Sequence, residues 1–334
     1  MSKKMSFPIR AFNKFFNIPT EIPNFAQIEI TNICNLDCKM CVRNFIKLGI
    51  KHMDFDLFKR IVDKLDGVYT LNLTGYGEPL AHPRIIDAIK YCKSKGFEVQ
   101  TTTNGLLLNE DSKITNLISS GLDLIAFSVE SIKEINEIAH QNLKALENIK
   151  RLIELKKELN SPTPTVTLQT LMIKGKEQDL FDVIEWGVMN GVDRINVARF
   201  DLNTLTDVER PNVIEEQAIF REFARLRKKY NIRIDCVQDQ FYDGLKGFLY
   251  KHLKHFLEYD RNCARLNDFT YINLEGDVRP CCALVNNKIH NLLESNLREI
   301  WNSEKYNNFR KNHFKIPWCS NCDVFTLRQK SIKV

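Results

Sequence analysis

The sequence has no long apolar run. Its 334 residues contain no stretch of about 20 predominantly apolar residues, the length that spans a bilayer. The first residues are basic but carry neither the apolar core nor the small-residue cleavage site of a secretory signal. No internal repeat or low-complexity tract is present, and glycine and proline number only 13 and 10. We therefore expect a globular, cytoplasmic protein with no membrane-spanning segment.

An excess of charge of one sign is also lacking. The formal net charge is +6, and charged residues make up 27% of the chain. Basic residues alternate with acidic ones along the helical stretches, which is typical of a solvated helix face. We expect no nucleic-acid partner from this pattern, whereas a mildly basic surface suits an acidic protein partner.

Cysteine, by contrast, is plentiful and grouped. The chain has ten cysteines, and a cytoplasmic compartment disfavours a disulfide framework. Two groups stand at opposite ends of the chain: Cys34, Cys38 and Cys41, then Cys263, Cys281, Cys319 and Cys322. Cys92 and Cys236 stand alone, and we expect them to be small buried apolar residues. The grouping predicts two metal centres.

The first group lies in "CNLDCKMC", where three thiols can converge on one point. Zinc, a disulfide or an iron–sulfur cluster could each account for them. A structural zinc site needs four ligands, and the closest histidine in sequence, His52, is not an obvious fourth. A four-iron cluster held by three cysteines leaves one iron open to a small molecule. We interpret the motif as an iron–sulfur site with an open iron.

Short β-type runs alternate with amphipathic helical stretches from residue 25 to about 200. The strand candidates are "AQIEIT", "YTLNLTG", "FEVQTTTNG", "LDLIAFSVE", "TVTLQTLMI" and "DRINVARF". Six consecutive βα units predict a parallel sheet with helices on its outer face. Six units are too few for a closed eight-stranded barrel. We therefore expect an α/β fold, an open partial (β/α)6 barrel.

The polar motifs follow these strands. The cysteine loop comes after the first strand, "GYGEP" after the second and "TNG" after the third, while Ser128 and Glu130 end the fourth. Because the chemistry of such sheets gathers at the carboxyl ends of the strands, we expect these residues to meet.

The remaining chain predicts further parts. Residues 1–24 are an N-terminal extension, 25–210 the partial barrel, and 211–260 a helical connection. Residues 261–334 contain a hairpin turning at Glu275 to Asp277, one helix over "LREIWNSEKYNNF" and the pair "CSNC". These four parts are our expected domain organisation.

"CNLDCKMC" followed by "GYGEP" and "TNG" resembles the radical S-adenosylmethionine (radical SAM) superfamily. The resemblance implies that Cys34, Cys38 and Cys41 hold a [4Fe–4S] cluster whose open iron binds SAM. One electron then cleaves SAM to methionine and a 5'-deoxyadenosyl radical. The implied SAM-binding residues are Met40 against the adenine, Gly75, Tyr76, Gly77 and Glu78 at the ammonium, Asn104, and Ser128. Two features depart from the family: Glu130 stands where an aspartate is usual, and a customary arginine is missing after it.

The C-terminal cysteines resemble the SPASM/Twitch extension of the same superfamily. The full SPASM pattern needs further cysteines, and none follows Cys322. The resemblance therefore implies a shorter, Twitch-like form in which Cys263, Cys281, Cys319 and Cys322 hold one auxiliary [4Fe–4S] cluster. Cys281 is preferred to its neighbour Cys282 because it fits the Gly-x4-Cys register. A four-cysteine zinc site is the alternative.

The motif layout is similar to that of 2-deoxy-scyllo-inosamine dehydrogenases. This implies a radical SAM oxidoreductase that oxidises a sugar or cyclitol, with the auxiliary cluster as electron acceptor and flavodoxin or ferredoxin as electron donor. The alternatives are a maturase or epimerase of a ribosomal peptide, and a non-enzymatic iron–sulfur or zinc scaffold. We favour the sugar because no peptide-recognition domain precedes Cys34. Gln169 and Arg199 are expected in the pocket, where Arg199 could hold an anionic group or form a salt bridge, and Glu130 is the candidate base.

Overall fold

The computed structural model describes residues 18–46, 49–133, 143–201, 203, 208–239, 263–322 and 324. Within these ranges one ten-stranded sheet runs through the molecule in the order β10-β9-β8-β1-β2-β3-β4-β5-β6-β7. The strands are β1 (Phe25–Ile28), β2 (Thr70–Asn72), β3 (Glu98–Thr103), β4 (Leu124–Ser128), β5 (Thr165–Met172), β6 (Arg194–Arg199), β7 (Arg233–Cys236), β8 (Phe269–Ile272), β9 (Asp277–Arg279) and β10 (His290–Asn291).

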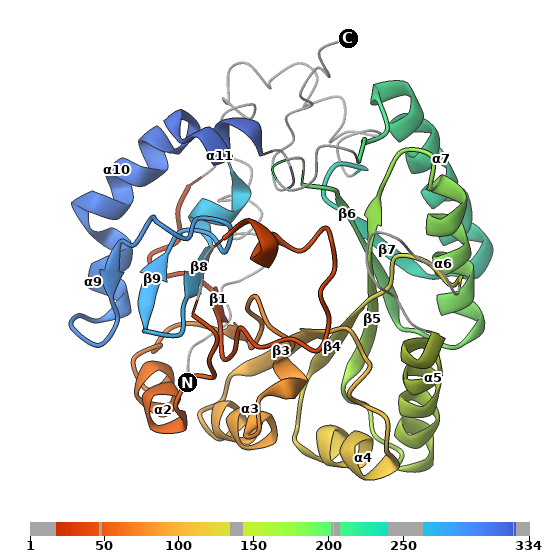
Figure 1. The fold of residues 1–334 in the computed structure, drawn as a ribbon, viewed down its shortest axis with the longest axis horizontal. Helices are drawn as coiled ribbons and strands as arrows, with labels where there is room; N and C mark the ends of the chain where they lie inside the picture. Colours follow the sequence, from red (N-terminus) through yellow and green to blue (C-terminus); the bar gives the residue numbers. More distant parts are fainter. Residues whose placement is uncertain are drawn as a thin grey trace.

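Helices cover the outer face of the curved sheet (Figure 1). The barrel helices are α2 (Phe55–Val62), α3 (Ile85–Ser94), α4 (Asp111–Ser119), α5 (Leu143–Glu158), α6 (Glu177–Met189) and α7 (Val213–Tyr230). The C-terminal helices are α9 (Leu297–Asn302), α10 (Glu304–Asn312) and α11 (Pro317–Asn321). Short 3-10 turns are η1 (Val42–Phe45), η2 (Pro79–Ala81), η4 (Ala264–Asn267) and η5 (His313–Lys315). No helix among the described residues is long and apolar enough to cross a membrane.

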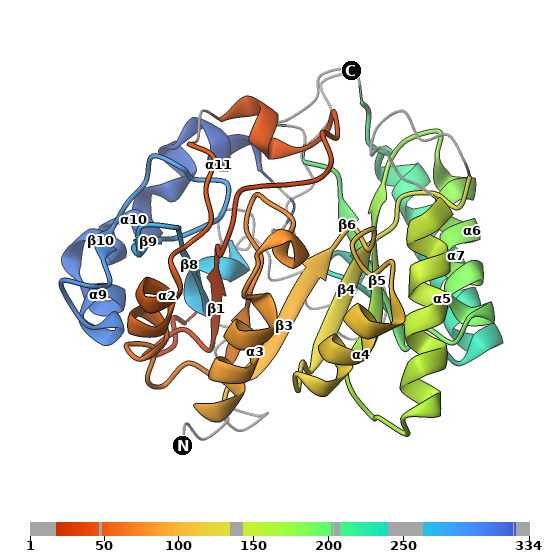
Figure 2. The ribbon, with the colours of Figure 1, turned by 60° about the horizontal axis from the view of Figure 1, so that its bottom comes forward.

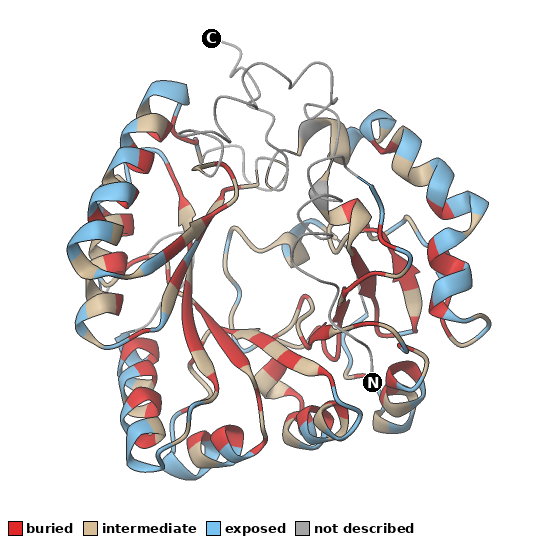
Figure 3. Ribbon diagram, turned by 180° about the vertical axis from the view of Figure 1, so that it is seen from behind, coloured by how far each residue is buried: buried red, intermediate tan, exposed pale blue. Residues whose placement is uncertain are grey.

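Amphipathic patterning places the core between the sheet and this ring of helices. In α2, the side chain of Asp54 accepts hydrogen bonds from the backbone of Asp56 and Leu57, which starts the helix as an N-cap. Phe58, Ile61 and Val62 then fall on one face and are buried. Figure 3 shows the same division around the barrel, with buried positions facing the sheet and exposed positions facing outward. The predicted open partial barrel is confirmed.

The structure has two strands that the sequence analysis missed, β7 and the two-residue β10. Residues 211–260 were expected to be helical throughout, but β7 follows α7 and pairs in parallel with β6. Asn231 ends α7 in the left-handed conformation, and Ile234 and Cys236 then alternate with more exposed residues, the period of a half-buried strand. Residues 240–260 of the expected connection lie outside the described residues, as do residues 134–142 of the long helix expected before β5.

The C-terminal segment joins the same sheet. β8 pairs in parallel with β1, from Phe25 opposite Phe269 to Ile28 opposite Ile272, so β1 is not an edge strand. The predicted hairpin is confirmed: β8 and β9 are antiparallel, and Gly276 in the turn has a φ of +80°. The single helix expected after it is two helices, because Ser303 ends α9 and caps α10. Figure 2 shows the C-terminal elements beside β1.

Candidate functional site

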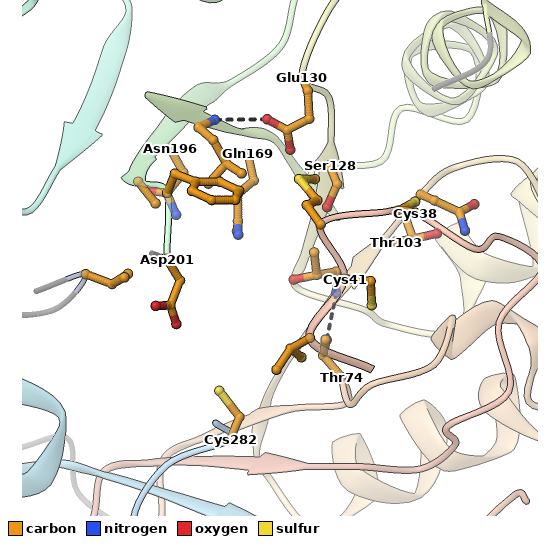
Figure 4. Close-up of a pocket in the computed structure, with 18 of the residues that line it drawn as sticks. Cys38, Cys41, Thr74, Thr103, Ser128, Glu130, Gln169, Asn196, Asp201 and Cys282 are labelled. Atoms are coloured by element: carbon orange, nitrogen blue, oxygen red, sulfur yellow. Dashed lines mark hydrogen bonds between the residues drawn. The ribbon is translucent and has the colours of Figure 1, made fainter. Parts of the chain in front are cut away.

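A large cavity lies at the carboxyl ends of the barrel strands. Its volume is about 630 Å³, within the size range of small-molecule sites. The lining includes Cys34, Cys38 and Cys41 from one side and Arg265 and Cys282 from the C-terminal segment. In Figure 4 the side chains of Cys38, Cys41 and Cys282 are drawn around this cavity together with residues from the strand ends. The cavity therefore brings the first cysteine group to the C-terminal segment that contains Cys282.

The cysteine loop after β1 is held by its own backbone and by two side chains. Cys41 N donates to Cys38 O over 2.9 Å, Asn44 Nδ2 donates to the same oxygen over 2.9 Å, and Arg43 donates to Leu36 O over 2.7 Å. All three cysteines are partly exposed and carry no disulfide. Among the described residues, no three cysteine, histidine or acidic side chains are already gathered into metal-binding geometry. The loop nonetheless directs three thiols to one cavity.

The electrostatics of this loop fit a cationic cluster. Burial raises the pKa of Cys34, and burial followed by the neighbouring charges of Cys41 and Cys34 raises the pKa of Cys38 to about 11. Thiolates are the form that binds metal. Iron supplies the positive charge that offsets both burial and mutual repulsion of the sulfurs. The three residues therefore have the donor chemistry that a [4Fe–4S] cluster requires, and they line one cavity.

The loop after β2 is hydrogen-bonded to the segment that leads into the cysteines. Tyr76 N donates to Glu29 Oε1 over 3.1 Å, Gly77 N to Thr31 O over 3.1 Å, and Glu78 N to Ile33 O over 2.8 Å. These bonds occupy the N–H groups, so an ammonium ligand at this loop would be received by carbonyl oxygens. A Cβ on Gly77 would lie 2.7 Å from the Ile33 nitrogen, which explains the glycine by close backbone approach.

The C-terminal cysteines come from three segments of the chain, one of which also carries Cys282 of the cavity lining. Cys263 precedes η4, Cys281 and Cys282 follow β9, and Cys319 and Cys322 lie in and directly after α11. A hydrogen bond from Cys281 to Cys282 raises the pKa of Cys281, and the charge on Cys263 raises it further. Burial, followed by the same Cys263 charge, raises the pKa of Cys319 to about 12. Cys263, Cys281 and Cys319 are thus close enough to act on one another electrostatically.

Comparisons with known proteins agree with this geometry. The radical SAM superfamily profile matches residues 28–187, and the SPASM iron–sulfur cluster-binding domain profile matches residues 263–323. The chain belongs to the radical SAM superfamily. As predicted, this radical SAM protein carries a SPASM-type domain, and the two domains imply SAM, a [4Fe–4S] cluster and auxiliary iron–sulfur binding. Members of the superfamily are enzymes.

Two curated relatives of this radical SAM protein extend over most of its length. The tungsten-containing aldehyde ferredoxin oxidoreductase cofactor-modifying protein of Pyrococcus furiosus is 26% identical over 326 residues, which cover 90% of this chain and 87% of that protein. The PqqA peptide cyclase of Bradyrhizobium diazoefficiens is 25% identical over 322 residues, 90% of this chain and 79% of that protein.

A solved structure shares the fold. Streptococcus suis SuiB bound to its precursor peptide SuiA has a TM-score of 0.70 and 17% identity, and the match covers 97% of this chain and 77% of that chain. SuiB bound to S-adenosylmethionine has the same TM-score. At this identity the likeness shows the fold alone.

In this radical SAM fold, the carboxylate of Glu78 is held by hydrogen bonds from neighbouring residues. Its carboxylate accepts hydrogen bonds from Leu80 N, Thr103 Oγ1 and Asn104 N at 2.7–3.0 Å and is buried. Asn104 in turn donates from Nδ2 to Asn35 Oδ1 over 2.8 Å, inside the cysteine loop. The "GYGEP" and "TNG" motifs are therefore bonded to each other and to the cluster loop.

Glu78→Gln is expected to lower the free energy of unfolding by about 1–3 kcal/mol, because an amide that donates where a carboxylate accepted leaves buried N–H groups unsatisfied. Chemical denaturation measures the change. Glu110→Gln, an exposed carboxyl paired with Lys113, is the matched control and is expected to change stability little. Equal stability of both variants would contradict the role of Glu78.

Glu130 and Ser128 both line the cavity. Glu130 accepts a hydrogen bond from Leu171 N over 3.0 Å, the dashed line beside it in Figure 4. Burial raises the pKa of this carboxyl to about 7. A carboxyl with this pKa exchanges a proton near neutral pH.

The other predicted residues divide into two kinds. Met40, Tyr76 and Gln169 line the cavity, and the hydroxyl of Tyr76 donates to the carbonyl of Cys282. Arg199 also lines it, but its guanidinium forms a buried two-pronged ion pair with Glu216, with both N–O distances 2.6 Å. Of the two alternatives for Arg199, the structure shows the salt bridge.

Sequence reasoning missed several polar residues of the lining, among them Asn196, Asp201 and Cys282. Asn196 is within β6 and Asp201 lies two residues after its end, so the position of Asp201 near a strand end was a usable signal. Cys282 was set aside in favour of Cys281, yet it is Cys282 that lines the cavity, with Arg265 donating to its sulfur over 3.5 Å.

Proposed function

We propose that this protein is a radical SAM enzyme that modifies a peptide by removing a hydrogen atom from one of its carbons. The observation that carries the radical chemistry is the cavity at the strand ends, lined by Cys34, Cys38 and Cys41 on one side and by Cys282 of the C-terminal segment on the other. The peptide is supported by the relatives, since PqqA peptide cyclase is named for a peptide and SuiB is solved bound to the precursor peptide SuiA. The earlier preference for a sugar or cyclitol finds no comparable support, and the peptide alternative fits better. The Pyrococcus furiosus relative is named for cofactor modification, so the substrate test includes non-peptides.

Each wall of the cavity has a proposed task. Cys34, Cys38 and Cys41 would hold the [4Fe–4S] cluster, and the carbonyls of the loop from Gly75 to Glu78 would receive the amino group of SAM. When bound, this pair supplies a 5'-deoxyadenosyl radical. Asn104 and Ser128 complete the SAM side, while Gln169, Asn196 and Asp201 line the substrate side.

The C-terminal wall and the outer surface complete the proposal. The four C-terminal ligands Cys263, Cys281, Cys319 and Cys322 would hold an auxiliary cluster that accepts an electron. The net charge of +6 suits an acidic electron donor, for which flavodoxin or ferredoxin remains the prediction.

The test begins with anaerobic reconstitution, followed by dithionite and SAM. 5'-Deoxyadenosine is expected, together with roughly eight iron atoms per chain for two four-iron clusters. Short peptides encoded beside the gene are then incubated with the enzyme and weighed by mass spectrometry, in parallel with a panel of cyclitols and amino sugars. A mass change confined to the sugar panel would reverse the substrate proposal, and absence of 5'-deoxyadenosine would favour a non-enzymatic scaffold.

Glu130 is proposed as the proton acceptor in oxidation of the substrate radical. Because its pKa is raised to about 7, it is protonated below that pH and can accept a proton only above it. The yield of oxidised product per 5'-deoxyadenosine is therefore expected to rise as pH increases through about 7. In Glu130→Gln the yield should fall at least about tenfold and lose this pH dependence, while SAM cleavage continues. Glu110→Gln serves as control. If the pH dependence of the yield were unchanged in Glu130→Gln, Glu130 would not be the proton acceptor.

A further inference from the structure

A second cavity lies apart from the site described above. Its volume is about 200 Å³, and its walls come from the end of β1, residues 49–51 and the turn between β8 and β9. None of its lining residues lines the larger cavity. The charged side chains around it are Glu29, Lys51, Glu275 and Arg279.

Arg279 is the unexplained group in this cavity. Its side chain is 92% buried, since its relative exposure is 8%. Nε is buried without a hydrogen-bond partner, and the guanidinium forms no hydrogen bond or ion pair with any residue in the ranges that the structure describes. The contrast is Arg199, whose equally buried guanidinium has Glu216 as a two-pronged partner. A buried, unpaired charge is strongly unfavourable, so a partner is expected.

The acidic residues nearby are engaged elsewhere. Glu29 accepts a hydrogen bond from Tyr76 N, and burial raises its pKa to about 7, so near neutral pH it is partly uncharged. Glu275 pairs with Lys51 over 2.6 Å. Asp277, on the same strand as Arg279, pairs with Lys288 over 2.6 Å. Arg279 acts on Glu29 and Asp277 through its charge, but among the described residues no acid accepts a hydrogen bond from its buried Nε.

Arg279 lines a different cavity from the one that Cys282 lines. It stands opposite Tyr271 on β8, and it shares the smaller cavity with residues 273–275 of the turn.

We propose that this cavity binds a small oxyanion, a carboxylate or phosphate group, through Arg279, with Lys51 at its rim. A planar guanidinium suits such groups because it donates two parallel hydrogen bonds to their oxygens. The bound anion would lie next to Glu29, which accepts a hydrogen bond from Tyr76 N in the glycine loop. It would also lie beside β9, the strand that leads to Cys281. This site is independent of the proposed peptide substrate.

The experiment uses the full chain under anaerobic conditions in buffer free of oxyanions. Inorganic phosphate and acetate are titrated separately at constant ionic strength set with chloride, and heat of binding and the thermal midpoint are recorded. Saturable binding of either anion is expected; phosphate binding alone indicates a phosphate-type ligand, and acetate binding a carboxylate-type ligand. A response no larger than that to chloride, for both anions, overturns the proposal.

Two variants sharpen the result. Arg279→Gln is expected to weaken anion binding at least tenfold, while being no less stable than the wild type in oxyanion-free buffer, because an unpaired buried charge has been removed. Arg279→Lys keeps the positive charge but lacks the planar guanidinium that donates two parallel hydrogen bonds. This variant should bind the anion with intermediate affinity. Arg298→Gln, at an exposed arginine paired with Glu21, is the matched control. Wild-type anion affinity in Arg279→Gln would refute the site.

Discussion

Cys34→Ser is expected to abolish 5'-deoxyadenosine formation, with a loss of at least about 100-fold, since removing even an outer hydrogen-bonding partner of a metal ligand costs 10–100-fold. Cys34 lines the main cavity with Cys38 and Cys41, and the three supply all the thiolates proposed for the first cluster. With two left, a four-iron cluster would have two open corners. Iron content should fall from roughly eight to roughly four atoms per chain while the C-terminal cluster persists.

The matched control for Cys34→Ser is Cys92→Ala. Cys92 is fully buried on α3 among apolar residues, and it does not line the cavity. This variant should keep both its iron and its SAM cleavage. If Cys34→Ser retained wild-type iron and formed 5'-deoxyadenosine at the wild-type rate, the open-iron interpretation of the motif would be wrong. Zinc in place of iron in either group would show directly in the metal analysis.

The barrel could be predicted because its signals are local. In α2 the spacing of Phe58, Ile61 and Val62 encodes a helix face without reference to the rest of the chain. β7 was missed because it has four residues, two of them charged, directly after an 18-residue helix. The pairing of β8 with β1 could not be predicted from local sequence either. The paired residues Phe25 and Phe269 are separated by 244 positions in the chain.

The sequence motifs of the site could be predicted, but the directions in which their side chains point could not. Cys281 and Cys282 are adjacent, and neighbouring residues at a strand end point to opposite sides, so only the folded register shows that Cys282 lines the cavity. Arg199 has the right position at a strand end, but its partner Glu216 lies on the following helix. Spacing alone does not tell which acid will face it. Glu78 lines the cavity with the rest of its motif, but spacing did not indicate the three hydrogen bonds that its carboxylate accepts.

Gly77→Ala is expected to have the second large effect, on stability and on SAM binding together. The added Cβ would lie 2.7 Å from the carbonyl carbon of Asn32 and 2.7 Å from the Ile33 nitrogen. Both are backbone atoms, so relief requires the two segments to separate. Such overpacking costs about 1–3 kcal/mol. Separation would also strain the bonds from Gly77 N to Thr31 O and from Glu78 N to Ile33 O, which fix the entry to Cys34.

Denaturant titration and equilibrium binding of SAM to the reconstituted protein check this expectation. Gly49→Ala is the matched control, because a Cβ there meets nothing within 4 Å, and its midpoint and SAM affinity should stay near the wild type. If Gly77→Ala matched the control in both measurements, the backbone contact between the glycine loop and the cysteine loop would not be what positions the cofactor. A loss of SAM affinity with little loss of stability would instead assign the contact to the ligand site alone, because the loop carbonyls proposed to receive the amino group move with Gly77.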